Sequence, residues 1–147
     1  MDLKILTREY LRAYRRRLGS SWEINYGDCY RWALLAQRLN GGQLISVTVM
    51  CEDTFSEKPD QYIEDGTHAF VLIDGKYYDS ESPEGVTDWH QLNYFHRHKK
   101  SIDNMYGFKY KYRVHPSVRS FKRYWKPNRN TSKADLRLYN KIVKEFS

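Results

Sequence analysis

The sequence has little of what disulfide-stabilised or membrane proteins need. Its two cysteines, Cys29 and Cys51, are too few for a disulfide framework and predict free thiols in a reducing compartment. No stretch is long and apolar enough to predict a membrane-spanning helix. Charges also interrupt residues 1–9, where a secretory signal would be hydrophobic. We therefore expect no membrane partner and a cytoplasmic location.

Motifs for metals and cofactors are also missing. No glycine-rich phosphate loop is present, because Gly41-Gly42 follows a predicted helix and is typical of a helix end. There is no C-x-x-C pair, and His96 and His98 are separated by one residue in a charged segment. The sequence therefore predicts neither a metal site nor a cofactor.

What is present fits one globular domain, residues 1–147. Hydrophobic residues make up 40% of the chain and aromatic residues 16%, with 13 tyrosines. Charge is segregated: residues 1–17 carry six Lys/Arg and two acids, residues 18–96 four and thirteen, and residues 97–147 fifteen and three. The basic ends either fold back on the acidic middle or form a surface for a polyanion.

Hydrophobic periodicity outlines the elements. It predicts helices over 2–18, 29–40 and 87–97, a last helix capped by Ser132, and strands over 43–51 and 105–114. Asp28 is the predicted N-cap of the second helix, so that Cys29 lies in its first turn. Cys51 falls on the apolar face of a strand and is predicted to be core. Residues 52–67 show no period and predict a long loop.

The clearest motif is a hairpin. His68–Ile73 and Lys76–Asp79 flank Asp74-Gly75, a pair that favours a tight two-residue turn. Counting from this turn puts His68 and Asp79 on one face as diagonal neighbours, about 7–8 Å apart at the backbone. A carboxylate on one ring nitrogen leaves the other free to exchange a proton with a nucleophile. Glu81, directly opposite His68, is the alternative orienting group.

Cys29 is the candidate nucleophile. Unpaired N–H groups and the dipole at a helix N-terminus favour a thiolate, and a nearby imidazolium would favour it further. The carboxylate of Asp28 opposes this unless it is engaged in capping. The backbone N–H of Cys29 is a candidate oxyanion donor, with a second donor from Trp22, Asn25 or Tyr26.

The segment from Tyr26 to Gly85 resembles the papain-like fold, especially its transglutaminase-like and NlpC-type branches. The resemblance lies in the order of its parts: Gly-Asp-Cys at the start of a helix, then a strand, then a hairpin with His at its start and Asp at its end. The resemblance implies Cys29 as nucleophile, His68 as general base and Asp79 as orienting residue. It implies an α+β fold in which a catalytic helix packs on an antiparallel sheet. This core would span about residues 20–115, with extra helices at both ends and a basic C-terminal extension over 116–147.

We therefore predict a cysteine hydrolase or acyltransferase that acts through a thioester on a protein or peptide-like substrate. Peptidase, amidase and deamidase activities rank before transamidation, because water is always available as the acceptor.

The main alternative is a catalytically inactive papain-like scaffold that binds nucleic acid or protein. Lys109, Lys111 and Arg113 share one face of a predicted strand. Lys122 and Arg123 lie among aromatic residues, as phosphate contacts and base stacking require. The same pattern also fits a solvated face whose aromatic side chains point into the core. Both functions are compatible, since basic ends could guide a catalytic centre to an anionic polymer.

Overall fold

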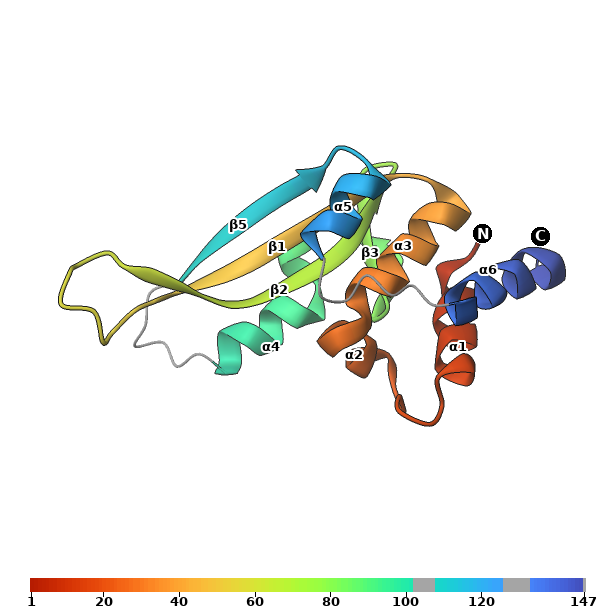
Figure 1. Cartoon of the computed structure of the whole chain (residues 1–147), viewed down its shortest axis with the longest axis horizontal. Helices are drawn as coiled ribbons and strands as arrows, with labels where there is room; N and C mark the ends of the chain where they lie inside the picture. Colours follow the sequence, from red (N-terminus) through yellow and green to blue (C-terminus); the bar gives the residue numbers. More distant parts are fainter. Residues whose placement is uncertain (102–107, 126–132, 147) are drawn as a thin grey trace.

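The protein is described from a computed structural model that covers residues 1–101, 108–125 and 133–146 (Figure 1). Its fold is α+β. Five antiparallel strands form one sheet in the order β4-β3-β2-β1-β5. The strands are β1 (Gln43–Glu52), β2 (Tyr62–Ile73), β3 (Lys76–Asp79), β4 (Ser82–Val86) and β5 (Phe108–His115).

The helices lie on both faces of the sheet and at one end of it. They are α1 (Leu3–Ala13), α2 (Ser21–Glu23), α3 (Cys29–Asn40), α4 (Asn93–Ser101), α5 (Val118–Tyr124) and α6 (Lys133–Phe146). A π-helical segment η1 (Ile24–Asp28) joins α2 to α3, and a short 3-10 helix η2 (Trp89–Gln91) precedes α4. Among the helices of these described ranges, none is long and apolar enough to cross a membrane.

Alternation along β1 and β2 gives the sheet two apolar faces. Leu44 and Ala69 pack with α3 and with Phe121 of α5 on one face. Ile45, Val47 and Phe70 pack with Phe95 of α4 on the other. In a third cluster α1, α3 and α6 pack together, so the two termini lie side by side at the end opposite the β1–β2 arm (Figure 1).

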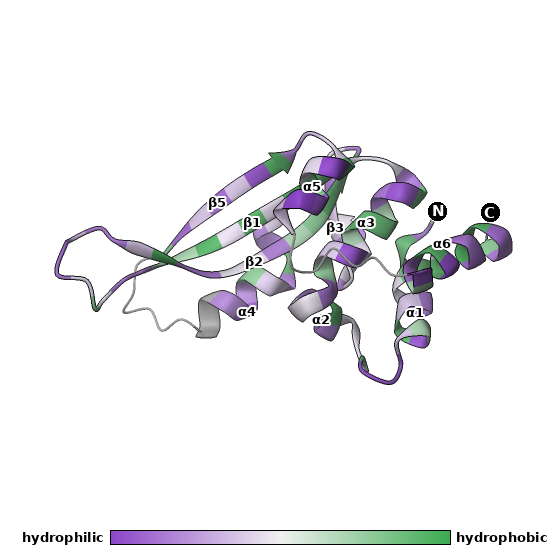
Figure 2. Ribbon diagram, in the orientation of Figure 1, coloured by the Kyte–Doolittle hydropathy of each residue, from purple (hydrophilic) through white to green (hydrophobic). Residues whose placement is uncertain are grey.

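The arm formed by β1 and β2 reaches beyond the helices. Figure 2 shows hydrophobic residues along the strands where helices cover them and mostly hydrophilic residues at the tip. The side chain of Phe55, at the tip, is 98% exposed. The helix-covered base of the sheet, not the arm, therefore supplies the core.

Several predicted elements are confirmed. The helix over 29–40 and the strand over 43–51 agree with α3 and β1 within one residue. The hairpin has the predicted register, with Ile73 opposite Lys76, Leu72 opposite Tyr77 and Val71 opposite Tyr78. Asp74 and Gly75 both adopt positive φ, as a tight hairpin turn requires.

Other predictions need correction. The helix predicted to reach residue 18 ends at Ala13. The chain turns after it, and Arg17 in the following segment binds Asp28. The segment predicted as a loop over 52–67 contains the first half of β2, from Tyr62. This half shows no period because both of its faces are largely exposed. Cys51 is half-buried rather than core.

The remaining differences concern ends and missed elements. The helix predicted over 87–97 consists of η2 and an α4 that runs on to Ser101, while β5 begins at Phe108. Short β4 and α5 were not predicted. Residues 105–107 of the predicted strand and the predicted cap Ser132 lie outside the described residues.

Candidate active site

Cys29 begins α3 directly after a kink. Tyr26 and Gly27 leave helical geometry, with φ of +131° at Gly27, and the chain re-enters a helix at Cys29. The sulfur accepts a hydrogen bond from the backbone N–H of Ala69 at 3.5 Å. The hairpin register would pair Ala69 with Ser80, but β3 ends at Asp79. The thiol thus accepts the backbone N–H that β3 leaves unpaired at Ala69. Cys29 itself is 4% exposed.

His68 is completely buried beside this thiol. Its Nε2 lies 2.9 Å from Oδ2 of Asp79, so the predicted diagonal pair is in contact. The imidazole stacks on the ring of Tyr94, with centroids 4.4 Å apart, and meets the edge of Phe95. Within the described ranges, Nδ1 of His68 is the one buried side-chain nitrogen or oxygen without a hydrogen-bond partner.

Asp79 is held as an acceptor by groups around it. Its Oδ1 accepts the backbone N–H groups of Glu81 and Ser82 at 3.0 and 2.9 Å. Its Oδ2 accepts from Asn25 at 3.3 Å in addition to His68. A carboxylate used in this way requires a proton on Nε2 of His68, which leaves Nδ1 as the nitrogen that can exchange a proton.

Two opposing effects act on the pKa of His68. Burial lowers this pKa, but the hydrogen bond to Asp79 and the proximity of Cys29 raise it by more than burial lowers it. The net result is a rise from the ordinary value of 6.5 to about 9. The imidazole is therefore protonated at neutral pH. An imidazolium beside a thiol is the arrangement that generates nucleophilic thiolates in cysteine enzymes.

Asp28 does not cap α3 through its side chain. It occupies the N-cap position, but its carboxylate accepts the Tyr10 hydroxyl at 2.6 Å and both guanidinium arms of Arg17 at 2.8 and 2.6 Å. Burial raises the pKa of Asp28, yet these bonds lower it overall. The negative charge next to Cys29 is therefore compensated by an ion pair rather than by helix capping.

The three predicted oxyanion donors differ in availability. The amide nitrogen of buried Asn25 donates to Asp79 and, at 2.8 Å, to Glu81, so both of its hydrogens are engaged. The Tyr26 hydroxyl meets Arg97 at 3.3 Å. Trp22 is half exposed, and its indole N–H has no hydrogen-bond partner in the described ranges. Both hydrogens of Asn25 are thus engaged, whereas the indole N–H of Trp22 and the hydroxyl hydrogen of Tyr26, which only accepts from Arg97, have no acceptor in the described ranges.

Glu81, the predicted alternative orienting group, has no hydrogen bond or ion pair with His68 in the described ranges. It forms an ion pair with Arg97, which donates to it at 2.7 Å through Nη1 and by a second, shorter contact. Burial raises the pKa of Glu81, but Arg97 and Asn25 more than offset this and lower it. Through Asn25, which it shares with Asp79, Glu81 helps to fix the surroundings of the site.

An aromatic series leads from the surface to His68. Trp22 contacts Tyr26, Tyr26 contacts Tyr94, and Tyr94 stacks on His68, with centroid distances of 5.9, 5.5 and 4.4 Å. Trp22 and Tyr26 are each 50% exposed. Sequence reasoning missed Tyr94 and Phe95 as packing partners of His68. The signal that could have found them is the apolar run Leu92, Tyr94, Phe95 in the predicted helix.

No family model matches the chain in comparisons with known proteins, and no curated protein or solved structure is significantly similar to it. Its function has to be argued from the site itself. The geometry combines a thiol at a helix start, a buried imidazole and a fully bonded carboxylate.

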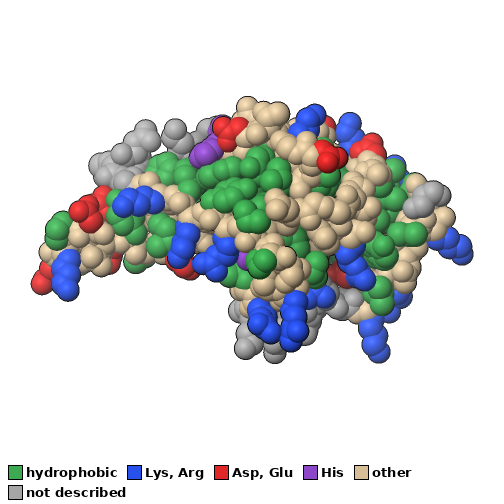
Figure 3. Space-filling model, turned by 90° about the horizontal axis from the view of Figure 1, so that it is seen from above, with side chains coloured by type: hydrophobic (Ala, Val, Ile, Leu, Met, Phe, Trp, Pro, Cys, Tyr) green, Lys and Arg blue, Asp and Glu red, His purple; other side chains and the backbone are tan. Residues whose placement is uncertain are grey.

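The predicted basic residues lie elsewhere on the surface. Lys109, Lys111 and Arg113 are exposed on one face of the edge strand β5, and Lys122 and Arg123 are exposed on α5. Arg113 lies over the ring of Tyr124, while the neighbouring Phe121 is buried. Figure 3, which looks onto the upper side of Figure 1, shows Lys and Arg side chains along the margin of a hydrophobic patch.

The second cysteine differs from the first. Burial and a hydrogen bond with Asp65 raise the pKa of Cys51 to about 11, so its thiol is protonated at neutral pH. In the described ranges it lies near neither His68 nor Asp79 but near Asp65 and His98. Cys51 is therefore not an alternative nucleophile for the site around His68.

Proposed function

We propose that this chain is a cysteine-dependent acyl-transfer enzyme with a papain-like core. The single observation that carries the proposal is the position of His68, bonded to Asp79 through one nitrogen and next to Cys29 with the other nitrogen unpartnered. In this reading Cys29 is the nucleophile, His68 the general base and acid, and Asp79 the orienting residue.

The reaction proceeds through a thioester. The Cys29 thiolate forms a bond to the carbonyl carbon of an amide, and the carbon–nitrogen bond breaks as His68 gives its Nδ1 proton to the leaving amine. Water then attacks the thioester while His68 takes a proton from the water. The carbon–sulfur bond breaks, the acid is released, and the Cys29 thiolate and the protonated His68 are restored. An amine in place of water would give transamidation. Hydrolysis ranks first because water needs no second binding site.

Burial of Cys29 and His68 strengthens their electrostatic interaction. The half-exposed rings of Trp22 and Tyr26 stand at the outer end of the aromatic series that ends at His68. We infer that a peptide-like substrate approaches along these rings. The backbone N–H of Cys29 would then stabilise the oxyanion, and the indole N–H of Trp22 and the hydroxyl of Tyr26 are the candidates for a second donor.

The test is the alkylation rate of Cys29 by iodoacetamide as a function of pH. Cys51→Ser serves as the background, so that Cys29 is the only thiol. We expect rapid alkylation at neutral pH that falls at least about tenfold in His68→Ala and shifts to higher pH. His96→Ala is the matched control, since His96 is exposed on α4. Equal rates and equal titration in all three proteins would refute the proposed pair, provided that circular dichroism shows each to be folded.

A binding module on an inactive scaffold is the second candidate. It is favoured by the exposed cations of β5 and α5 together with the 4% exposure of Cys29. This hypothesis expects affinity for a DNA or RNA oligonucleotide that falls steeply with salt concentration and survives Cys29→Ala. Charge reversal at Lys109 and Lys111 should abolish it. Binding that does not respond to salt would exclude nucleic acid as the partner.

A further inference from the structure

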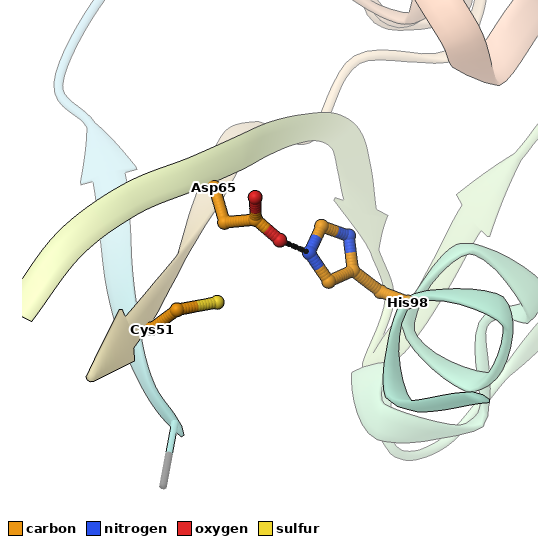
Figure 4. Close-up of side chains that lie close together, drawn as sticks. All are labelled: Cys51, Asp65 and His98. Atoms are coloured by element: carbon orange, nitrogen blue, oxygen red, sulfur yellow. Dashed lines mark hydrogen bonds and ion pairs between the residues drawn. The ribbon is translucent and has the colours of Figure 1, made fainter. Parts of the chain in front are cut away.

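A second group of cysteine, aspartate and histidine lies outside the candidate active site. The sulfur of Cys51 on β1, a carboxylate oxygen of Asp65 on β2 and a ring nitrogen of His98 on α4 all lie within 4.8 Å of one another (Figure 4). Asp65 Oδ2 and His98 Nε2 are 2.6 Å apart. In the described part of the chain, no other group of three such residues has converging donor atoms.

A β-bulge brings Asp65 into this group. Val49 pairs with Gly66 and Met50 with Glu64, so the register shifts and Asp65 has no partner on β1. A bulge of this kind re-aims a side chain at the cost of a ladder position. Figure 4 shows the result: the Asp65 carboxylate points at His98, and the Cys51 thiol points toward the same space.

Gly66 lets α4 lie directly on the bulge. Its φ is +140°, and a Cβ at this position would be 2.7 Å from the Tyr94 hydroxyl oxygen and 3.2 Å from Cε1 of His98. Any side chain here would therefore displace the Tyr94 hydroxyl and crowd the His98 ring that contacts Asp65. Two special backbone features, the bulge and this glycine, thus hold three donors from three elements together.

The same three residue types have a different arrangement in the candidate active site. There the imidazole of His68 stands between sulfur and carboxylate, and the donor atoms of Cys29, His68 and Asp79 do not converge. That order suits proton transfer. In the second group the sulfur, nitrogen and oxygen face a common point, which is the geometry of a metal centre.

We propose that Cys51, Asp65 and His98 bind a divalent transition-metal ion, with Zn²⁺ as the best fit. Thiolate, imidazole and carboxylate are its usual ligands, whereas Mg²⁺ and Ca²⁺ require oxygen alone. Zinc bonds of about 2.0–2.3 Å place tetrahedral ligand atoms roughly 3.3–3.8 Å apart, so small side-chain movements suffice. Binding breaks the S–H bond of Cys51 and releases that proton to solvent. Nε2 of His98 gives up the proton that it shares with Asp65, either to solvent or to Nδ1 of the same ring, and the Asp65–His98 hydrogen bond is replaced by two metal–ligand bonds.

Three protein ligands leave a fourth position for water. The ion would also tie the arm to α4, the helix that carries Tyr94 against His68. The proposal does not depend on acyl transfer, because the two sets of residues share no member.

The experiment uses Co²⁺ as a spectroscopic probe and Zn²⁺ in competition with a chromophoric chelator, both with the full chain. We expect one ion per chain, visible absorption typical of tetrahedral Co²⁺, and a near-ultraviolet thiolate-to-cobalt band. Zn²⁺ should displace the Co²⁺ and raise the thermal unfolding midpoint.

Cys51→Ser should remove the thiolate band, and Asp65→Asn should weaken Zn²⁺ binding at least about tenfold. Two matched controls should keep both signals: Cys29→Ser, which removes the other thiol, and His96→Ala on the same helix as His98. A wild-type Co²⁺ complex without a thiolate band would overturn the proposal, as would a band that disappears in Cys29→Ser but persists in Cys51→Ser. Circular dichroism of the metal-free variants separates loss of a ligand from loss of the fold.

Discussion

His68 combines complete burial with a ring nitrogen that lacks a partner in the described ranges. A buried polar atom without a hydrogen bond costs about 1–3 kcal/mol, so such atoms are rare in folded proteins. The surroundings nevertheless hold the ring firmly, with Asp79 on Nε2 and Tyr94 stacked on its face. This combination of a fixed imidazole and an open nitrogen is what the proposed proton transfer requires.

The raised pKa of His68 makes stability depend on pH. In the folded protein the pKa is about 9, above its ordinary value of 6.5. The imidazolium therefore stabilises the fold in full below pH 6.5, and this contribution is lost as pH rises through 9. Its size is at most about 3 kcal/mol. We expect the free energy of unfolding in urea to fall over this pH window in the wild type.

His68→Gln is the comparison protein, because glutamine can still donate to Asp79 but does not titrate. The difference in unfolding free energy between the two proteins should shrink steadily from pH 6.5 to 9. A difference that stays constant with pH would mean that the His68 pKa is not raised by folding.

Local turn chemistry explains why the sequence predicted part of the site. Asp74-Gly75 sets the hairpin register by positive φ at two consecutive residues, and that register alone brings Asp79 to His68. The bulge at Asp65 has no comparable signature. It lies where side chains of α4 pack over Gly66, a contact between distant segments that no local motif encodes. This is why the cluster around Cys51 was not predicted and a metal site was not expected.

Burial also explains which strands and which side-chain contacts could be predicted from the sequence. The alternation of the buried β1 predicts a strand, whereas the first half of β2 is exposed on both faces and its sequence predicts a loop. Asn25 was proposed as an oxyanion donor from its position near Cys29. Only the fold shows that Asp79 and Glu81 use both of its hydrogens.

Gly66 and Gly75 allow the effect of close packing to be measured. Both have positive φ, but a Cβ at Gly75 meets open space, whereas one at Gly66 would collide with Tyr94 and His98. Gly75→Ala should cost about 1 kcal/mol, the strain of the backbone alone. Gly66→Ala should cost at least about 1 kcal/mol more, because its Cβ would meet Tyr94 and His98 and because a φ of +140° is less accessible to alanine than a φ of +80°. Equal losses in urea unfolding would show that α4 is not held against the bulge.

α5 and the residue after it border the candidate active site. Phe121 and Trp125 pack in the cluster that contains Cys29, and Trp125 stacks on Tyr30 with centroids 5.7 Å apart. Trp125→Ala removes part of this cover, so iodoacetamide should alkylate Cys29 several times faster in the Cys51→Ser background. Phe55→Ala, at the exposed tip of the arm, is the aromatic control and should leave the rate unchanged. An unchanged rate in Trp125→Ala would mean that reagents reach Cys29 from another side.

Folding brings some of the basic residues near the chain ends into ion pairs with acidic residues of the middle segment. Arg17 from the basic start binds Asp28 of the acidic middle, and Arg97 from the basic end binds Glu81. Both pairs flank the candidate active site. The cations of β5 and α5 instead remain exposed and leave a positive surface. The basic ends therefore fold back on the acidic middle only in part, and a polyanionic partner stays compatible with the structure.

An ion pair between distant segments tests whether residues 1–147 unfold as one domain. Asp135 of α6 is 4% exposed and accepts two hydrogen bonds from Arg31 of α3, at 2.8 and 2.7 Å, as well as one from Tyr14. Removing one partner of a buried pair leaves an uncompensated charge. Because Arg31 can turn to Asp28, 3.5 Å away, we expect Asp135→Asn to cost about 1–3 kcal/mol rather than the full penalty.

The loss should appear as an earlier midpoint of a single urea transition, followed by tryptophan fluorescence and by circular dichroism. Asp88→Asn is the control, because the exposed Asp88–His90 pair should contribute nothing measurable. If α6 is an independent appendage, Asp135→Asn will leave the midpoint of the fluorescence transition unchanged. A separate early phase will then appear in circular dichroism. Coincident transitions shifted together would establish that the basic C-terminal helix belongs to the same cooperative unit as α3, and hence as Cys29.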